Sequence, residues 1–204
     1  MKSIESENEE KVFGIGLSRT GTTSLAHALR KIGYSTAHWK VQGKIIGIEE
    51  LYEFDAVTDT PVSCRFEQLY RAFPKSKFIY TTRRLKGWIK SIKNHHGYEV
   101  PRSAPTPSHQ RRINNIKRST ESKHTYRNLL EAMYTYQSLY GRHESWKEAY
   151  KKHDENIKNF FKTRNEKRVL ELNVIGEKKP YTKLCQFLDV EEPKSSFPHK
   201  NKGS

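Results

Sequence analysis

The sequence predicts an α/β protein with three layers, in which helices cover both faces of a mostly parallel central sheet. Two observations support this fold class. A short apolar stretch at residues 11–17 is followed by a glycine-containing loop and then by a helical pattern. Further strand-like stretches then alternate with helical ones along the 204 residues, and such alternation favours parallel strands joined by crossover helices.

The first half of the chain contains three strand patterns, which are expected at residues 11–17, 56–58 and 77–82. Each precedes a stretch with apolar residues at helical spacing. These helices are expected at residues 22–32, at about 64–73 and around Trp88, Ile89 and Ile92. Gly33 and Pro74 follow the first two helices and act as stop signals.

The second half is predicted to be mainly helical. Residues 97–110 contain three prolines and no periodicity, so we expect a mobile loop there. Long helices at about 120–139 and 143–163, a strand at 168–172, a helix at 181–188 and an irregular tail from 193 follow. Residues 1–10 are expected to form an acidic tail, and residues 11–204 a single domain.

The composition indicates a folded core beneath a very polar surface. Hydrophobic residues make up 34% of the chain, charged residues 30% and aromatic residues 11%. No apolar run reaches the ~18 residues that a membrane helix needs, and the N-terminus resembles no signal peptide. Cys64 and Cys185 are too few for a disulfide framework. We therefore expect a cytoplasmic protein with no membrane contact.

Positive charge is concentrated in one part of the chain. The formal net charge is +15, and residues 71–127 hold 15 Lys or Arg against two acids, a local excess of 13. Such a concentration produces a field that attracts phosphate, sulfate or polyanions. The alternative interpretation is a solvated basic face that only keeps the protein soluble.

The loop before the first helix is the most informative segment. Gly16 and Gly21 have the spacing of a phosphate-binding loop. Its backbone N–H groups, together with the N-terminus of the following helix, would bind an anion with several oxygens. The Lys that nucleotidases carry directly after the second glycine is replaced by Thr22, and the cation is instead Arg19. Alternatively, Gly14 and Gly16 only allow the strand and helix to pack closely.

The segment Arg19-Thr20-Gly21-Thr22-Thr23 resembles the 5′-phosphosulfate loop of the sulfotransferase family, whose pattern is Lys-Ser-Gly-Thr-Thr after a strand. The resemblance extends over about residues 12–201. It implies a P-loop NTPase-like sulfotransferase fold and 3′-phosphoadenosine 5′-phosphosulfate (PAPS) as co-substrate. The product would be 3′-phosphoadenosine 5′-phosphate (PAP), and no metal is implied. The residues implied to hold the 5′-phosphosulfate are Ser18, Arg19, Thr20, Gly21, Thr22 and Thr23.

A second part of the resemblance concerns the 3′-phosphate. The family carries an Arg at a strand end and a Ser eight residues later, and Arg83 and Ser91 have this spacing here. Arg supplies forked, charge-assisted hydrogen bonds to a phosphate, and Ser adds one more. The alternative is that Arg83, Arg84 and Lys86 are solvated charges at a helix start, although such a position usually favours acids.

The resemblance also implies catalytic roles. Arg19 would stabilise the charge that develops on the departing phosphate. Asp59, which precedes Thr60-Pro61, aligns with the region of the family's general base, although an Asp there can equally cap a helix. His38 is the alternative base. His95 and His96 could line the acceptor entrance, but a surface pair is the interpretation the sequence favours.

Two other classes of function compete with this prediction. A P-loop kinase or NTPase would also use a phosphate loop, but the missing Lys after Gly21 argues against it. A nucleic-acid-binding protein fits the basic stretch, although no recognition motif is present. The acceptor is expected to be a hydroxyl or amine on a small molecule or glycan. No oligomeric state follows from the sequence.

Overall fold

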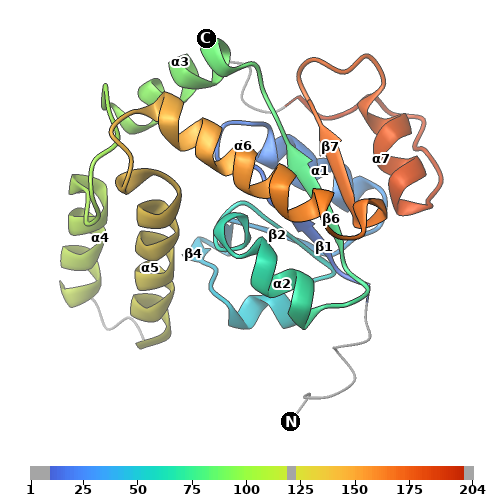
Figure 1. Cartoon of the computed structure of the whole chain (residues 1–204). Helices are drawn as coiled ribbons and strands as arrows, with labels where there is room; N and C mark the ends of the chain where they lie inside the picture. The colour runs from blue at the N-terminus through green and yellow to red at the C-terminus, as the bar shows by residue number, and fades with distance from the viewer. Residues whose placement is uncertain (1–9, 119–122, 200–204) are drawn as a thin grey trace.

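The computed structural model describes residues 10–118 and 123–199 and confirms the α/β class with a mostly parallel sheet (Figure 1). Within these residues the sheet has the strand order β4-β3-β2-β5-β1-β6-β7. Neighbouring strands from β2 to β7 in this order are parallel, whereas β3 and β4 extend the sheet in antiparallel fashion. The strands are β1 (Val12–Gly14), β2 (Thr36–His38), β3 (Lys40–Val41), β4 (Lys44–Ile45), β5 (Ala56–Thr58), β6 (Lys77–Thr81) and β7 (Val169–Leu172).

The described helices fall into two groups. One group packs directly on the sheet and consists of α1 (Thr22–Lys31), α2 (Phe66–Ala72), α6 (Trp146–Lys162) and α7 (Pro180–Leu188). The other group lies toward one side and consists of α3 (Leu85–His96), α4 (Pro107–Arg118), α5 (Lys123–Tyr136) and the π-helical turn η4 (Gln137–Gly141). Short 3-10 turns are η2 (Glu49–Tyr52), η3 (Val62–Cys64) and η5 (Glu166–Arg168).

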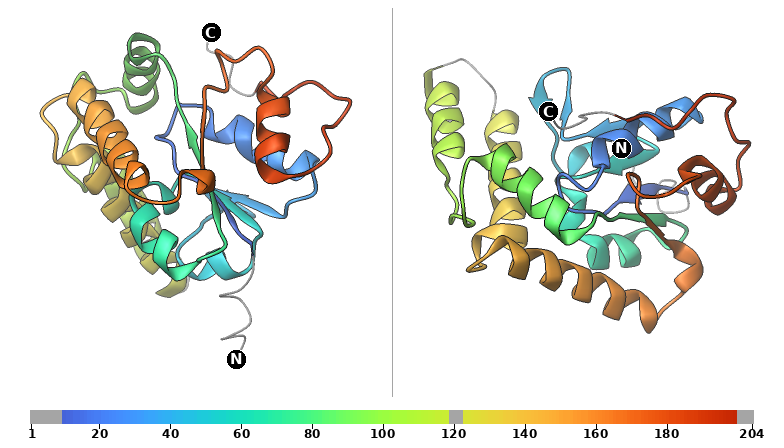
Figure 2. Two further views of the ribbon diagram at one scale, coloured as in Figure 1. Left: turned by 45° about the vertical axis from the view of Figure 1, so that its right-hand side comes forward. Right: turned by 90° about the horizontal axis from the view of Figure 1, so that it is seen from above.

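Both faces of the parallel strands are buried, because successive side chains of a strand point to opposite sides. Val12 and Ile79 pack with α1 and α7 on one face. Phe13 and Phe78 pack with α2 and α6 on the other. Figure 2 shows these two helical layers on either side of the sheet. A third apolar cluster around Trp88 joins α3, η4 and the start of α6.

Most predicted elements lie where the periodicity placed them, but one expectation was wrong and three strands were missed. Residues 107–110, predicted as loop, form the first turn of α4, with Pro107 at its first position, where a missing N–H costs nothing. The basic stretch is therefore helical over 107–118. The strands β2, β3 and β4 were not predicted from the sequence. The predicted acidic tail lies outside the described residues except for Glu10, as do residues 200–204.

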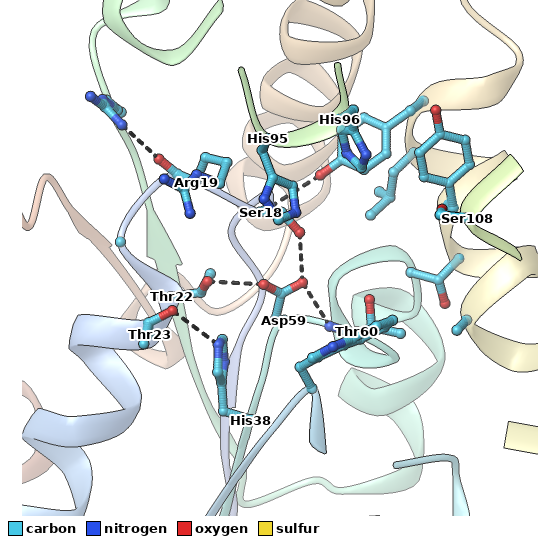
Figure 3. A pocket seen from close by; sticks show the side chains of 18 of the residues that line it. Ser18, Arg19, Thr22, Thr23, His38, Asp59, Thr60, His95, His96 and Ser108 are labelled. Carbon is cyan, nitrogen blue, oxygen red and sulfur yellow. Dashed lines mark hydrogen bonds between the residues drawn. The ribbon is translucent and has the colours of Figure 1, made fainter. Parts of the chain in front are cut away.

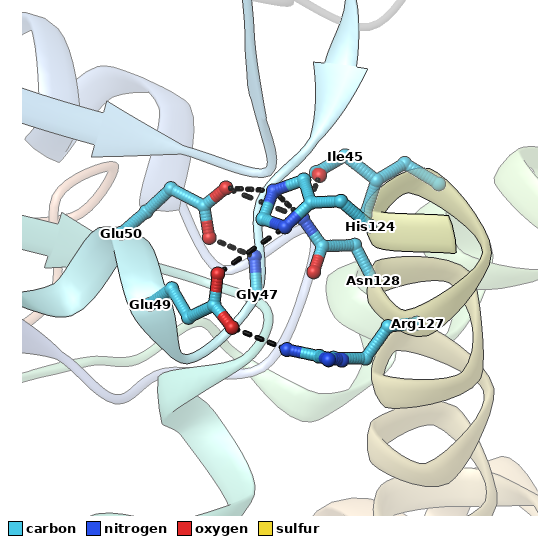
Figure 4. A network of polar contacts seen from close by, with 7 residues as sticks. All are labelled: Ile45, Gly47, Glu49, Glu50, His124, Arg127 and Asn128. Atoms are coloured by element: carbon cyan, nitrogen blue, oxygen red, sulfur yellow. Dashed lines mark hydrogen bonds and ion pairs between the residues drawn. The ribbon is translucent and has the colours of Figure 1, made fainter. Parts of the chain in front are cut away.

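A polar network joins α5 to the antiparallel extension of the sheet (Figure 4). The Asn128 side-chain amide donates to the Ile45 carbonyl at 2.9 Å and to Glu50 Oε1 at 3.2 Å. The His124 ring lies between Glu50 and Glu49, at 3.1 and 3.2 Å. These contacts fix the position of α5, which forms one wall of the cavity described below.

The buried His153 on α6 predicts how stability depends on pH. Its Nε2 donates to the Ile15 carbonyl at 2.9 Å, and burial lowers the pKa of its imidazole to about 4 from 6.5. Between these two values the unfolded chain binds one more proton than the folded chain, so stability decreases as the pH falls through that window. The linked loss is about 3 kcal/mol.

We therefore expect the thermal unfolding midpoint to decrease between pH 6.5 and 4.5 in wild type, and to decrease less in His153→Gln, which can still donate to Ile15. Scanning calorimetry over this range measures both slopes, with far-UV circular dichroism at pH 7 confirming that the variant folds. Equal slopes for the two proteins contradict this assignment.

Candidate functional site

The predicted site residues lie where parallel strands end, at the carboxyl edge of the sheet. After β1 the chain first forms β2 to β5, which lie on one side of β1 in the sheet, and then β6, which lies on its other side. The strand order therefore reverses at β1. Ligands bind outside such reversal points in open α/β sheets. A cavity of about 570 Å³ lies there, lined by the loop before α1 and by the ends of β2 and β5 (Figure 3).

The loop from residue 15 to 21 is closely packed against its neighbours. A Cβ atom on Gly16 would lie 2.0 Å from Thr81 Oγ1, so only glycine fits. Gly21 caps α1 with φ 109°, and Arg19 also has a positive φ of 73°. The N–H groups of Thr22 and Thr23 have no partner within the helix, which leaves them available to an anion.

Asp59 connects the loop to the end of β5. Its Oδ1 accepts hydrogen bonds from Ser18 Oγ and from the Thr60 N–H, both at 2.9 Å, and its Oδ2 accepts from Thr22 Oγ1 at 3.0 Å. The residue has a φ of 70°, a left-handed conformation that few aspartates adopt. The carboxylate therefore joins the first part of the loop to the first residue of α1.

Aromatic side chains from the helical side hold the peptide groups of Ser18. The Ser18 N–H donates to Tyr140 Oη at 3.0 Å, and its carbonyl accepts from Trp88 Nε1 at 2.9 Å. Tyr140 and Trp88 are both buried. Burial raises the pKa of the Tyr140 phenol, which consequently stays protonated.

The structure places both Arg83 and Ser91 beside Arg19 of the loop. Arg19 Nε donates to Ser91 Oγ at 3.1 Å, and Arg83 Nη1 donates to the Arg19 carbonyl at 3.2 Å. Burial and the neighbouring Arg19 lower the pKa of the Arg83 guanidinium. Neither arginine forms an ion pair with an acid among the described residues. Two converging cations without a carboxylate favour a bound anion.

His38 lies at the end of β2 with both ring nitrogens occupied. Its Nδ1 contacts Thr58 Oγ1 at 2.9 Å, and its Nε2 contacts Thr23 Oγ1 at 3.1 Å. Burial lowers the pKa of the imidazole, so His38 is neutral at pH 7. Its ring orients the Thr23 hydroxyl, the second hydroxyl of the predicted anion-binding loop.

The structure places the Thr20 side chain differently from the prediction. Its hydroxyl donates to the Leu17 carbonyl at 2.6 Å and lies 2.7 Å from Thr81 Oγ1. It is buried and does not line the cavity. Thr20 therefore stabilises the turn itself, and any contact it makes with an anion is through its backbone.

Sequence reasoning missed the far wall of the cavity. His95 and His96, for which the sequence favoured a surface pair over the acceptor entrance, line it together with His109 and Arg112 of α4 and Tyr136 of α5, although His95 is also exposed. His96 stacks on Trp146 with ring centroids 5.4 Å apart, and burial lowers its pKa to about 4. No local pattern marks these residues, because they reach the site only through the packing of α3, α4 and α5.

Comparison with known proteins identifies the family. Residues 11–45 and 48–204 match the family model described as "Sulfotransferase domain", so the chain belongs to this family. The match agrees with the resemblance of the loop and of the Arg83–Ser91 spacing, and it favours this prediction over a kinase or a nucleic-acid-binding protein.

Two particular proteins resemble this chain. "Ava biosynthesis cluster protein M" of Aspergillus versicolor is 33% identical over 109 residues, which are 41% of this chain and 42% of that protein. A crystal structure of mouse sulfotransferase SULT7A1 complexed with PAP is 18% identical, with a TM-score of 0.44, over 93% of this chain and 63% of that chain. The chain thus matches less than two thirds of the length of either protein.

The described residues contain neither a metal-binding cluster nor a membrane-spanning helix. No group of three or more His, Cys, Asp or Glu side chains is arranged to hold a metal ion. In the same part of the chain, no helix is long and apolar enough to cross a membrane.

The Tyr140 hydroxyl can be tested as a support of the loop. In Tyr140→Phe the Ser18 N–H loses its acceptor, and a buried unsatisfied N–H costs about 1–3 kcal/mol. We expect the thermal unfolding midpoint to decrease by several degrees, measured by scanning fluorimetry. Tyr126→Phe, at an exposed position on α5, is the matched control. An unchanged midpoint in Tyr140→Phe contradicts the role.

Proposed function

We propose that this protein transfers a sulfuryl group from PAPS to a hydroxyl or amine of a small-molecule or glycan acceptor. The observation that carries the proposal is the convergence of Arg19, Arg83 and Ser91 beside a glycine loop that opens a helix. Family membership supports the same reaction. A cytoplasmic location and the absence of a nucleic-acid partner stay predictions.

The residues of the loop suit the 5′ end of the donor. Thr22 and Thr23 offer backbone N–H groups and hydroxyls, and Arg19 offers a guanidinium. Sulfuryl transfer, like phosphoryl transfer, is an in-line displacement in which charge develops on the leaving phosphate. Cations and N–H donors that face this charge lower the barrier. Arg19 and the first N–H groups of α1 are placed for this role.

Arg83 and Ser91 suit the second phosphate of the donor. They lie at the end of β6 and on α3, and Tyr150 Oη donates to the Arg83 carbonyl at 2.6 Å. This contact holds the backbone from which the Arg83 guanidinium projects. The two residues and Arg19 thus form a continuous set of donors that can span both charged ends of one nucleotide.

Asp59 is the better candidate for the general base of the two that the sequence proposed. Its Oδ2 accepts a hydrogen bond from Thr22 among the described residues, and its side chain lines the cavity. A carboxylate oxygen has room for a second donor, and this position suits the acceptor hydroxyl. His38 has both ring nitrogens bonded within the protein, so it orients Thr23 in this proposal.

Binding of PAP tests the donor site directly. We expect isothermal titration calorimetry at low salt to detect binding to wild type, and Arg83→Ala to weaken it by about 10- to 100-fold, since a hydrogen bond to a charged group contributes about 1.5–3 kcal/mol. Arg84→Ala removes the same charge from the exposed neighbouring residue and should change the affinity little. Absence of PAP binding to wild type would refute the proposed function.

Replacement of Asp59 by Asn tests the base. Asn keeps one oxygen that can accept from Ser18, so we expect PAP to bind with similar affinity. Transfer of labelled sulfate from PAPS to a panel of phenols, alcohols and amines should decrease by about 100-fold or more. Turnover equal to that of wild type would place the base elsewhere.

A further inference from the structure

A third arginine lies at the opposite side of the cavity from Arg83. Arg112 belongs to α4, is half-buried and lines the cavity. Its guanidinium carbon lies 5.2 Å from the centroid of the Trp39 ring, which lines the cavity as well. Trp39 directly follows His38 at the end of β2. The cation is thus stacked on an aromatic plane at the β2 side of the site.

Arg112 has no anionic partner in the described part of the chain. No ion pair or hydrogen bond of its side chain is found there, and burial lowers the pKa of its guanidinium. Asp59 is the one acidic residue among those that line the cavity, and it already accepts three hydrogen bonds. A partly desolvated cation that faces a cavity without an anion gains most from an anionic ligand.

The strand order separates Arg112 from the donor cations. Arg83 follows β6, whereas Trp39 and its partner Arg112 adjoin β2, and β5 and β1 lie between these two strands. Asp59, at the end of β5, lies between the two ends. A nucleotide held by Arg19, Arg83 and Ser91 consequently leaves the Arg112 end free for the second substrate.

The part of the cavity lining that comes from α4, α5 and η4 combines aromatic and apolar side chains with the uncharged polar Ser108 and Thr135. Tyr136 and Leu139 belong to it, and His109 packs edge-on against Tyr136 at 5.3 Å. Burial and the neighbouring Arg112 lower the pKa of His109, so it adds no positive charge at neutral pH. The charged feature of this half of the cavity is therefore Arg112.

We propose that the acceptor of this enzyme carries an anionic group, a carboxylate or its equivalent, which pairs with Arg112 while its hydroxyl lies at Asp59. The inference rests on the proposed function. In the transfer step, the acceptor oxygen forms a bond to sulfur and its proton passes to Asp59. The bond between sulfur and the bridging oxygen of PAPS breaks, and PAP leaves with the electron pair.

The test compares acids with their uncharged amides on PAP-loaded enzyme. The probes are 4-hydroxybenzoate and 4-hydroxycinnamate, two lengths of hydroxy acid, each against its carboxamide, with affinities from calorimetry. We expect at least one acid to bind ten-fold or more tightly than its amide. Arg112→Gln should abolish this preference without changing the affinity for PAP, and Arg112→Lys should restore part of it.

Arg111→Gln is the matched control, because Arg111 is the exposed neighbour on the same helix and carries the same charge. It should retain the preference for the acid. The inference is overturned if neither acid binds, if acids and amides bind equally, or if Arg111→Gln abolishes the preference as fully as Arg112→Gln. PAP binding without any acceptor reports on the proposed function separately, so the two failures are distinguishable.

Discussion

The site depends on the attachment of one loop to the rest of the protein. The loop between β1 and α1 has left-handed backbone at Arg19 and Gly21, a conformation that costs free energy at a non-glycine residue. Asp59 offsets this cost by bonding Ser18 and Thr22 together. Because Asp59 also lines the cavity, the same carboxylate holds the loop and faces the space in front of it.

The helices beside the sheet have two roles. Tyr140 and Trp88 bind the Ser18 peptide groups, and His153 donates to the Ile15 carbonyl. Of these elements, α3 and η4 also form part of the far wall of the cavity, together with α4 and α5. A change in how α3 and η4 pack would therefore alter the loop geometry and the shape of the cavity together.

Only folding brings some of the chain's many positive side chains to one common cavity. Arg19, Arg83 and Arg112 face one cavity from two sides, whereas Arg84 and Arg111 are exposed to solvent. Arg83 and Arg84 are adjacent in the sequence, as are Arg111 and Arg112, yet one residue of each pair lines the cavity and the other is exposed to solvent. The basic stretch is thus neither a uniform solvated face nor a uniform anion-binding surface, because successive side chains leave the backbone in different directions, both in the segment between β6 and α3 and on α4.

The sequence by itself determined the parallel α/β architecture and the glycine loop between β1 and α1, and it predicted a common role for Arg83 and Ser91, since these features depend on spacing within a strand–loop–helix unit. Only the tertiary structure decided that Thr20 turns inward, that His38 has both nitrogens occupied, and that α4 brings Arg112 to Trp39. These features arise from contacts between segments far apart in the chain. Local periodicity reports which face of an element is buried, but not which distant side chain meets it.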